Sequence, residues 1–179
     1  MSSFERTLKK IYETDISAGT TAVNIDNIFK PGYLYLILGD GIYGSVDTYL
    51  KIRLRKNGAI DGDANYQCTD QILQQNGGLA VQARNSLGSL HDTIYYQDNA
   101  GESASFEITL NAGSGAKYFT TSQSYGVGHT NVGYSLRVSG TLKLASAMND
   151  GINFNPNTGT LEGGTIKIYE YEFDKDRFI

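Results

Sequence analysis

Residues 34–55 read LYLILGDGIYGSVDTYLKIRLR, and this stretch decides the fold class. An apolar run leads into Gly39, Gly41 and Gly44, which have the G-x-G-x-x-G spacing of a dinucleotide-binding turn. Such a turn needs a helix directly after the glycines, because the pyrophosphate lies against the N-terminus of that helix. Residues 45–55 instead alternate with a period of two. The stretch therefore predicts two β-strands joined by a flexible turn, and no nucleotide site.

The same alternation continues on both sides of this stretch. It predicts strands over residues 105–110 and 134–144, and a final strand over residues 165–173. Two segments interrupt the pattern, because residues 69–80 fit a loop or a short helix and residues 111–131 fit a long polar loop. With the shorter runs we expect about eight strands, which predicts a single all-β domain built as a sandwich or jelly roll.

The N-terminal segment has a different period. Residues 4–12, FERTLKKIY, carry apolar residues at the i, i+3 and i+4 spacing of an amphipathic helix. A helix this short is marginal in water, so it needs a surface on which to dock. The residues expected to form this assembly contact are Phe4, Leu8, Ile11 and Tyr12. We expect a docking arm over residues 1–19 and a β-sandwich domain over residues 20–179.

Charge and cysteine content narrow the function classes. The 179 residues carry a net charge of −4, whereas nucleic-acid binders usually carry a basic excess. No apolar stretch approaches the roughly 20 residues of a membrane span. Cys68 is the only cysteine, and His91 and His129 lie far apart without the spacing of zinc ligands. We therefore expect no nucleic-acid partner, no membrane, no metal and no cofactor.

Residues 61–72 begin like the calcium loop of an EF-hand, with oxygen-bearing side chains at alternate positions. Two departures remove what that geometry needs. Tyr66 stands where the sharp turn requires glycine, and Ile72 stands where a bidentate glutamate is required. A turn stabilised by its own Asp and Asn side chains is favoured, and a calcium site of another kind stays open.

Two strands carry stripes of opposite charge. The basic stripe consists of Lys51, Arg53 and Arg55, and the acidic stripe consists of Glu170, Glu172 and Asp174. Opposite charges on neighbouring strands attract modestly. The matching period leaves two interpretations: the stripes pair, within one subunit or across a subunit boundary, or both are solvated faces.

Three aromatic residues fall within the expected polar loop over residues 111–131. They are Tyr118, Phe119 and Tyr125. Aromatic side chains on exposed loops often bind sugars or protein partners. These three residues therefore form the candidate surface for recognition of a ligand.

Three further features carry a resemblance to a known family. The first is YLYLIL followed by a glycine turn and LKIRLRKNGAIDGDANYQ, over residues 33–67. The second is SFEITL at residues 105–110, and the third is INFNPNTGTLEGGTIKIYEYEF at residues 152–173. Over residues 20–173 the chain resembles the β-sandwich modules of tailed-bacteriophage virion proteins, such as tail fibres and capsid decoration proteins.

The resemblance implies a function in assembly. Such proteins are commonly trimeric, dock on major capsid or tail proteins, and lie on the exterior of a particle made in the host cytoplasm. The family lacks a catalytic motif, and the sequence contains no G-x-S-x-G elbow or comparable nucleophile motif. We therefore expect a non-catalytic capsid decoration protein or a short tail or neck appendage. The alternative is a carbohydrate-binding module that recognises host-surface glycans.

Overall fold

The chain is built almost entirely of antiparallel β-structure. The computed structural model describes residues 7–61, 66–74, 79–87, 91–112, 117–126, 135–144 and 149–172. These residues form thirteen strands and one short 3₁₀ turn, η1 (Ala100–Glu102), and every strand pair is antiparallel. The predicted all-β class is confirmed.

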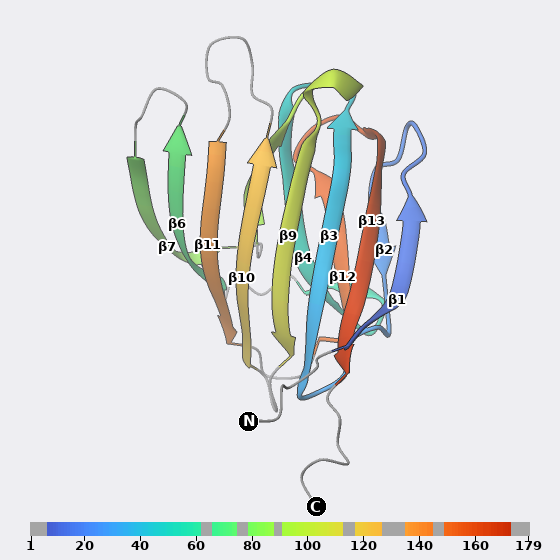
Figure 1. Cartoon of the computed structure of the whole chain (residues 1–179), viewed down its shortest axis with the longest axis vertical. Helices are drawn as coiled ribbons and strands as arrows, with labels where there is room; N and C mark the ends of the chain where they lie inside the picture. The colour runs from blue at the N-terminus through green and yellow to red at the C-terminus, as the bar shows by residue number, and fades with distance from the viewer. Residues whose placement is uncertain are drawn as a thin grey trace, which may run out of the picture.

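The larger sheet contains eight strands in the order β1-β13-β3-β9-β10-β11-β6-β7. In that order the strands are β1 (Thr7–Asp15), β13 (Leu161–Glu172), β3 (Tyr33–Gly44), β9 (Ala104–Ala112), β10 (Lys117–Gly126), β11 (Ser135–Leu144), β6 (Tyr66–Gln74) and β7 (Leu79–Leu87). Figure 1 shows this sheet from one face, with β1 and β7 at its two edges.

The smaller sheet has the order β2-β12-β4-β5, and β8 also pairs with β4. Its strands are β2 (Val23–Ile25), β12 (Gly151–Pro156), β4 (Thr48–Lys56), β5 (Ala59–Ile60) and β8 (His91–Tyr96). In Figure 1, β4, β12 and β2 lie behind β9, β3 and β13. Two facing antiparallel sheets are consistent with the predicted β-sandwich.

The core lies between the two sheets. Buried residues alternate along β3, β4 and β9, as the period-two pattern predicted. The largest fully buried side chains are Tyr35, Tyr96, Phe154, Ile37, Ile42, Leu50, Ile52 and Leu54. From opposite sheets, the rings of Phe106 and Phe154 stack with their centroids 6.0 Å apart. Burying an apolar side chain of this size stabilises the fold by about 1.5–3 kcal/mol.

The predicted N-terminal helix is wrong for the residues that the structure describes. Residues 7–15 form β1, which pairs with β13 at the edge of the larger sheet. A bulge between Lys10 and Tyr12 inserts one residue into the ladder. Ile11 and Tyr12 can therefore both pack against the core, although they are adjacent in sequence. The bulge thus accounts for the spacing that resembled a helix.

The predicted docking contact also includes Phe4 and Leu8. Phe4 lies outside the described residues. Leu8 is 46% exposed on β1. The division of the chain into an arm over residues 1–19 and a domain over residues 20–179 stays a prediction.

Two further predictions are wrong for the described residues: the loop or short helix over residues 69–80 and the long loop over residues 111–131. Most of residues 69–80 belongs to β6 and β7, and β10 occupies the middle of residues 111–131. Both segments are polar, so they lack the apolar alternation that marks a strand with one buried face. Thr, Tyr and Phe in β10 favour extended backbone all the same. The count of about eight strands was therefore too low.

The glycines of the G-x-G-x-x-G pattern lie inside β3, so the flexible turn predicted at these residues is wrong. A bend at residues 45–47 and then β4 follow them. A Cβ atom on Gly39 would lie 2.1 Å from Cε1 of Phe106, and one on Gly44 would lie 2.4 Å from Cε2 of Tyr96. These two glycines are therefore needed to admit aromatic rings against the sheet.

Gly39→Ala should lower the free energy of unfolding by about 3 kcal/mol, because the added methyl group overlaps the Phe106 ring. Urea denaturation measures the change. Gly101→Ala is the matched control, because its Cβ would meet only the side chain of Asn99 at 3.2 Å. In a Phe106→Leu background the cost of Gly39→Ala should shrink. An equal cost in both backgrounds would contradict the ring-clearance explanation.

Tyr35 should make the fold sensitive to alkaline pH. Its buried Oη accepts a hydrogen bond from the Lys30 N–H at 2.8 Å, and burial raises the pKa of Tyr35 to about 12. Between the unfolded pKa of about 10 and this value, only the unfolded state ionises, so stability falls as pH rises. Tyr35→Phe should reduce the loss of unfolding free energy at about pH 11 by about 1 kcal/mol. Denaturation curves of both proteins at a pH well below 10 and at about pH 11 test this. An equal loss of unfolding free energy in Tyr35→Phe and the wild type would contradict it.

Candidate functional site

The outer face of the smaller sheet carries an unusual set of polar residues. Ile25, Ile152 and Ile52 are buried in the core, so their neighbours along each strand lie on the opposite face. Asn24 of β2 pairs in register with Asn153 of β12, which pairs with Arg53 of β4. A row of amides and guanidinium groups therefore crosses three strands.

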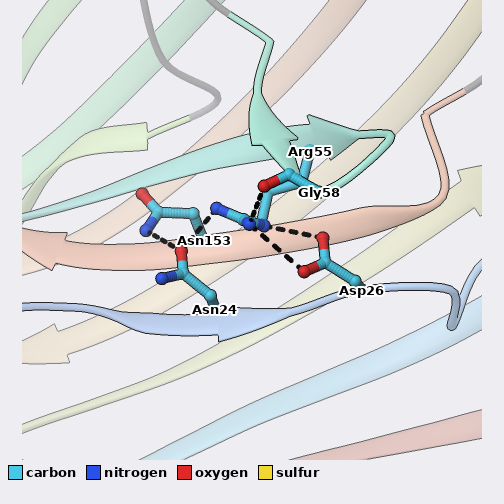
Figure 2. A network of polar contacts seen from close by, with 5 residues as sticks. All are labelled: Asn24, Asp26, Arg55, Gly58 and Asn153. Carbon is cyan, nitrogen blue, oxygen red and sulfur yellow. Dashed lines mark hydrogen bonds and ion pairs between the residues drawn. The ribbon is translucent and has the colours of Figure 1, made fainter.

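Arg55 is the centre of a hydrogen-bond network on this face (Figure 2). Its Nε donates to Oδ1 of Asp26 at 2.7 Å, and Nη2 donates to Oδ2 of the same carboxylate at 3.1 Å. Nη1 donates to Oδ1 of Asn24 at 2.6 Å, and Nη2 also donates to the carbonyl oxygen of Gly58. The Arg55 side chain is only 9% exposed, whereas that of Asp26 is 32% exposed. This network ties β2 to β4 and to the turn that follows β4.

Gly151 makes room for the network. It is the register partner of Arg55 on β12. A Cβ atom there would lie 2.2 Å from the carbonyl oxygen of Ile25 and 2.9 Å from Cα of Asp26. Because Gly151 has no side chain, the end of β2 can approach β12 closely enough for Asp26 to reach Arg55.

The network fixes the orientation of two amides. A guanidinium only donates hydrogen bonds, so Asn24 must turn its oxygen toward Arg55. That same oxygen accepts from Nδ2 of Asn153 at 2.9 Å (Figure 2). Asn153 must therefore present its nitrogen to Asn24, so Oδ1 of Asn153 needs a donor other than Asn24.

Among the described residues of this face, three buried side-chain atoms have no hydrogen-bond partner. They are Nε of Arg53, Oδ1 of Asn153 and Oδ1 of Asn155. An unsatisfied buried polar atom costs about 1–3 kcal/mol, and Asn153 is completely buried. The set contains one donor and two acceptors, so it is suited to a polar group that can both accept and donate.

Candidate metal ligands are not clustered in the described part of the chain. Within them, no three His, Cys, Asp or Glu side chains gather as a metal site. Of the segment that resembled a calcium loop, Asp61 accepts a hydrogen bond from Nδ2 of Asn149 at 2.7 Å, and residues 62–65 lie outside the described part. No helix in the described part of the chain is long and apolar enough to cross a bilayer.

The structure places the two charge stripes in different sheets. Arg53 and Arg55 belong to β4, whereas Glu170 and Glu172 belong to β13. The Arg55 side chain pairs with Asp26, while Oε2 of Glu170 lies 3.2 Å from Nζ of Lys30. Asp174 lies outside the described residues. Pairing of the stripes across a subunit boundary stays a prediction.

The candidate aromatic residues lie in an unexpected element. Tyr118, Phe119 and Tyr125 belong to β10 and not to a loop. Sequence reasoning missed the residues of the small-sheet face other than those of the basic stripe. The signal was present in residues 152–155, INFN, where amides alternate with apolar residues on a strand.

Searches against protein-family models, curated proteins and solved structures found no significant match to this chain. The resemblance to phage virion proteins therefore stays a proposal.

Arg55→Met should lower the free energy of unfolding by about 2 kcal/mol, because it leaves the Asp26 carboxylate without its guanidinium donor and removes one of the two donors to Oδ1 of Asn24. The figure is below the usual cost of breaking a buried ion pair, since Asp26 is partly solvated. Lys10→Met is the matched control, because Lys10 forms an exposed pair with Glu13 on β1; surface pairs contribute little. Denaturant titration compares the two variants, and equal effects would argue against a structural role for the Arg55 network.

Proposed function

We propose that this chain is a non-catalytic structural protein on the exterior of a tailed-phage virion. It would act as a capsid decoration protein or as a short tail or neck appendage, and would assemble as a homo-oligomer, with a trimer expected from the resemblance. The jelly-roll-like topology of that family is part of the same proposal.

The observation that carries this proposal is the edge strand β1. It extends over nine residues, and among the described strands it pairs only with β13. Its exposed backbone groups can accept another strand or a protein surface. The bulge near Ile11 and the charged Lys9, Lys10 and Glu13 discourage indiscriminate pairing. Such an edge is suited to one specific neighbour in an ordered assembly.

Leu8→Glu tests the role of this edge. Leu8 is 46% exposed on β1, and Val46→Glu is its matched control, because Val46 is 41% exposed in the bend between β3 and β4. By analytical ultracentrifugation, the wild type and Val46→Glu should be trimers, whereas Leu8→Glu should shift to monomers with an unchanged unfolding curve.

The virion location needs its own measurement. Antibodies raised against the purified chain should label the outside of tailed particles produced from the genome that encodes it. Immuno-electron microscopy shows whether they do. Unlabelled particles, together with a wild type that is monomeric at every concentration, would refute the proposed function.

A further inference from the structure

We infer that the outer face of the smaller sheet binds hydroxyl groups of an oligosaccharide, with Arg53 and Asn153 holding one hydroxyl between them. This inference does not depend on the proposed assembly, because it uses β4 and β12 and not the β1 edge. It rests on the buried, unpartnered atoms Nε of Arg53, Oδ1 of Asn153 and Oδ1 of Asn155.

Arg53 and Asn153 face each other across the small sheet. They are register partners on β4 and β12, which places their Cβ atoms about 5 Å apart on the same face. Their unpartnered atoms do not bond to each other. The bond from Nδ2 of Asn153 to Asn24 prevents the amide from turning to relieve this. A group inserted between the two side chains would satisfy both.

The chemistry of the atoms selects the kind of group. The Nε–H of Arg53 needs an acceptor, whereas the amide oxygens of Asn153 and Asn155 need donors. A metal cation would satisfy only the oxygens, and a fully ionised anion would satisfy only the guanidinium. A hydroxyl group accepts and donates at once. Adjacent hydroxyls on a sugar ring could therefore bond along the row in sequence.

The row continues toward an exposed aromatic ring. Asn155 pairs in register with Lys51, and the carbonyl of Tyr49 accepts a hydrogen bond from the Asn157 N–H at 2.8 Å. Tyr49 is 44% exposed, and it lies about 13 Å along the strand from Arg53 at about 3.3 Å per residue. Its ring offers an apolar surface to the C–H face of a sugar. The row thus has room for more than one sugar ring.

A ligand would reach the row past the partly exposed Arg53 side chain, whose Nε atom is itself shielded from solvent. Arg53 and Asn155 are half-buried, whereas Asn153 is fully buried beneath its neighbours. The long Arg53 side chain has many rotamers, so a small shift of this side chain admits a hydroxyl to Oδ1 of Asn153. In the absence of sugar, a water molecule can satisfy the same atoms, and binding then exchanges that water for the ligand.

An array of neutral and acidic oligosaccharides, probed with the intact chain, tests the inference. The strongest binder is then titrated calorimetrically. Arg53→Met and Asn155→Ala should each weaken binding by about tenfold or more, the usual effect of losing a hydrogen bond to a charged or buried group. Lys167→Met is the matched control: it removes a half-exposed charge from β13 of the other sheet, and should bind like the wild type.

Three outcomes would overturn the inference. One is a folded wild type that binds no sugar above background, which would mean that ordered water alone satisfies these atoms. Another is unchanged affinity in both Arg53→Met and Asn155→Ala. The third is an equal loss in Lys167→Met, which would reduce the effect to net charge. Because Arg53 lies on β4 of the smaller sheet and β1 is an edge strand of the larger sheet, Arg53→Met should leave the native mass unchanged, so failure here is distinct from failure of the assembly proposal.

Discussion

The two sheets depend on the position of one aromatic ring. Phe106 of β9 lies over Gly39 of β3, where no Cβ could fit, and stacks against Phe154 of β12. The ring therefore belongs to the larger sheet but contacts the smaller one. Interiors are packed densely enough that an added methyl group has no space to occupy. This contact links the two sheets within the core that buries both inner faces.

The outer face of the smaller sheet follows from a second chain of constraints. Asp26 orients the Arg55 guanidinium, Arg55 orients the Asn24 amide, and Asn24 orients the Asn153 amide. At each step the next side chain has only one orientation that brings a donor to an acceptor. A rigid, preorganised polar surface binds ligands with less loss of conformational entropy than a mobile one. The network that stabilises this sheet therefore also holds the Asn153 amide in the orientation that the inferred hydroxyl contact requires.

The sequence pattern predicted the fold class and the strands with one buried face. The alternation in residues 49–55 and 105–110 reflects a pleated strand with an apolar face, and both segments are strands. The alternation of apolar residues did not identify polar strands such as β10, because this pattern depends on the burial of one face and not on extended backbone. The bulge in β1 imitated a helical period over a few residues. The turn predicted at Gly39 was wrong, because glycine is required there by the Phe106 ring, which is distant in sequence.

The candidate face was predictable only in part. The basic residues of β4 stood out by their charge. Their partner Asn24 lies on a three-residue strand too short to show a period, and Asp26 directly follows that strand. The pairing of β2 with β12 spans more than a hundred positions of sequence, and it places Asn24 beside Asn153. Single-sequence patterns carry local information, so contacts of this range are invisible to them.

The placement of β12 and β13 bears on how the chain reaches its native state during synthesis. β13 pairs with β1 on one side and β3 on the other, and β12 lies between β2 and β4. Strands β1, β2, β3 and β4 therefore gain all their neighbours only when residues 151–172 have paired with them. Until then the growing chain exposes open sheet edges, which favour aggregation. Closing both sheets is therefore a long-range event, because strands more than a hundred residues apart must pair.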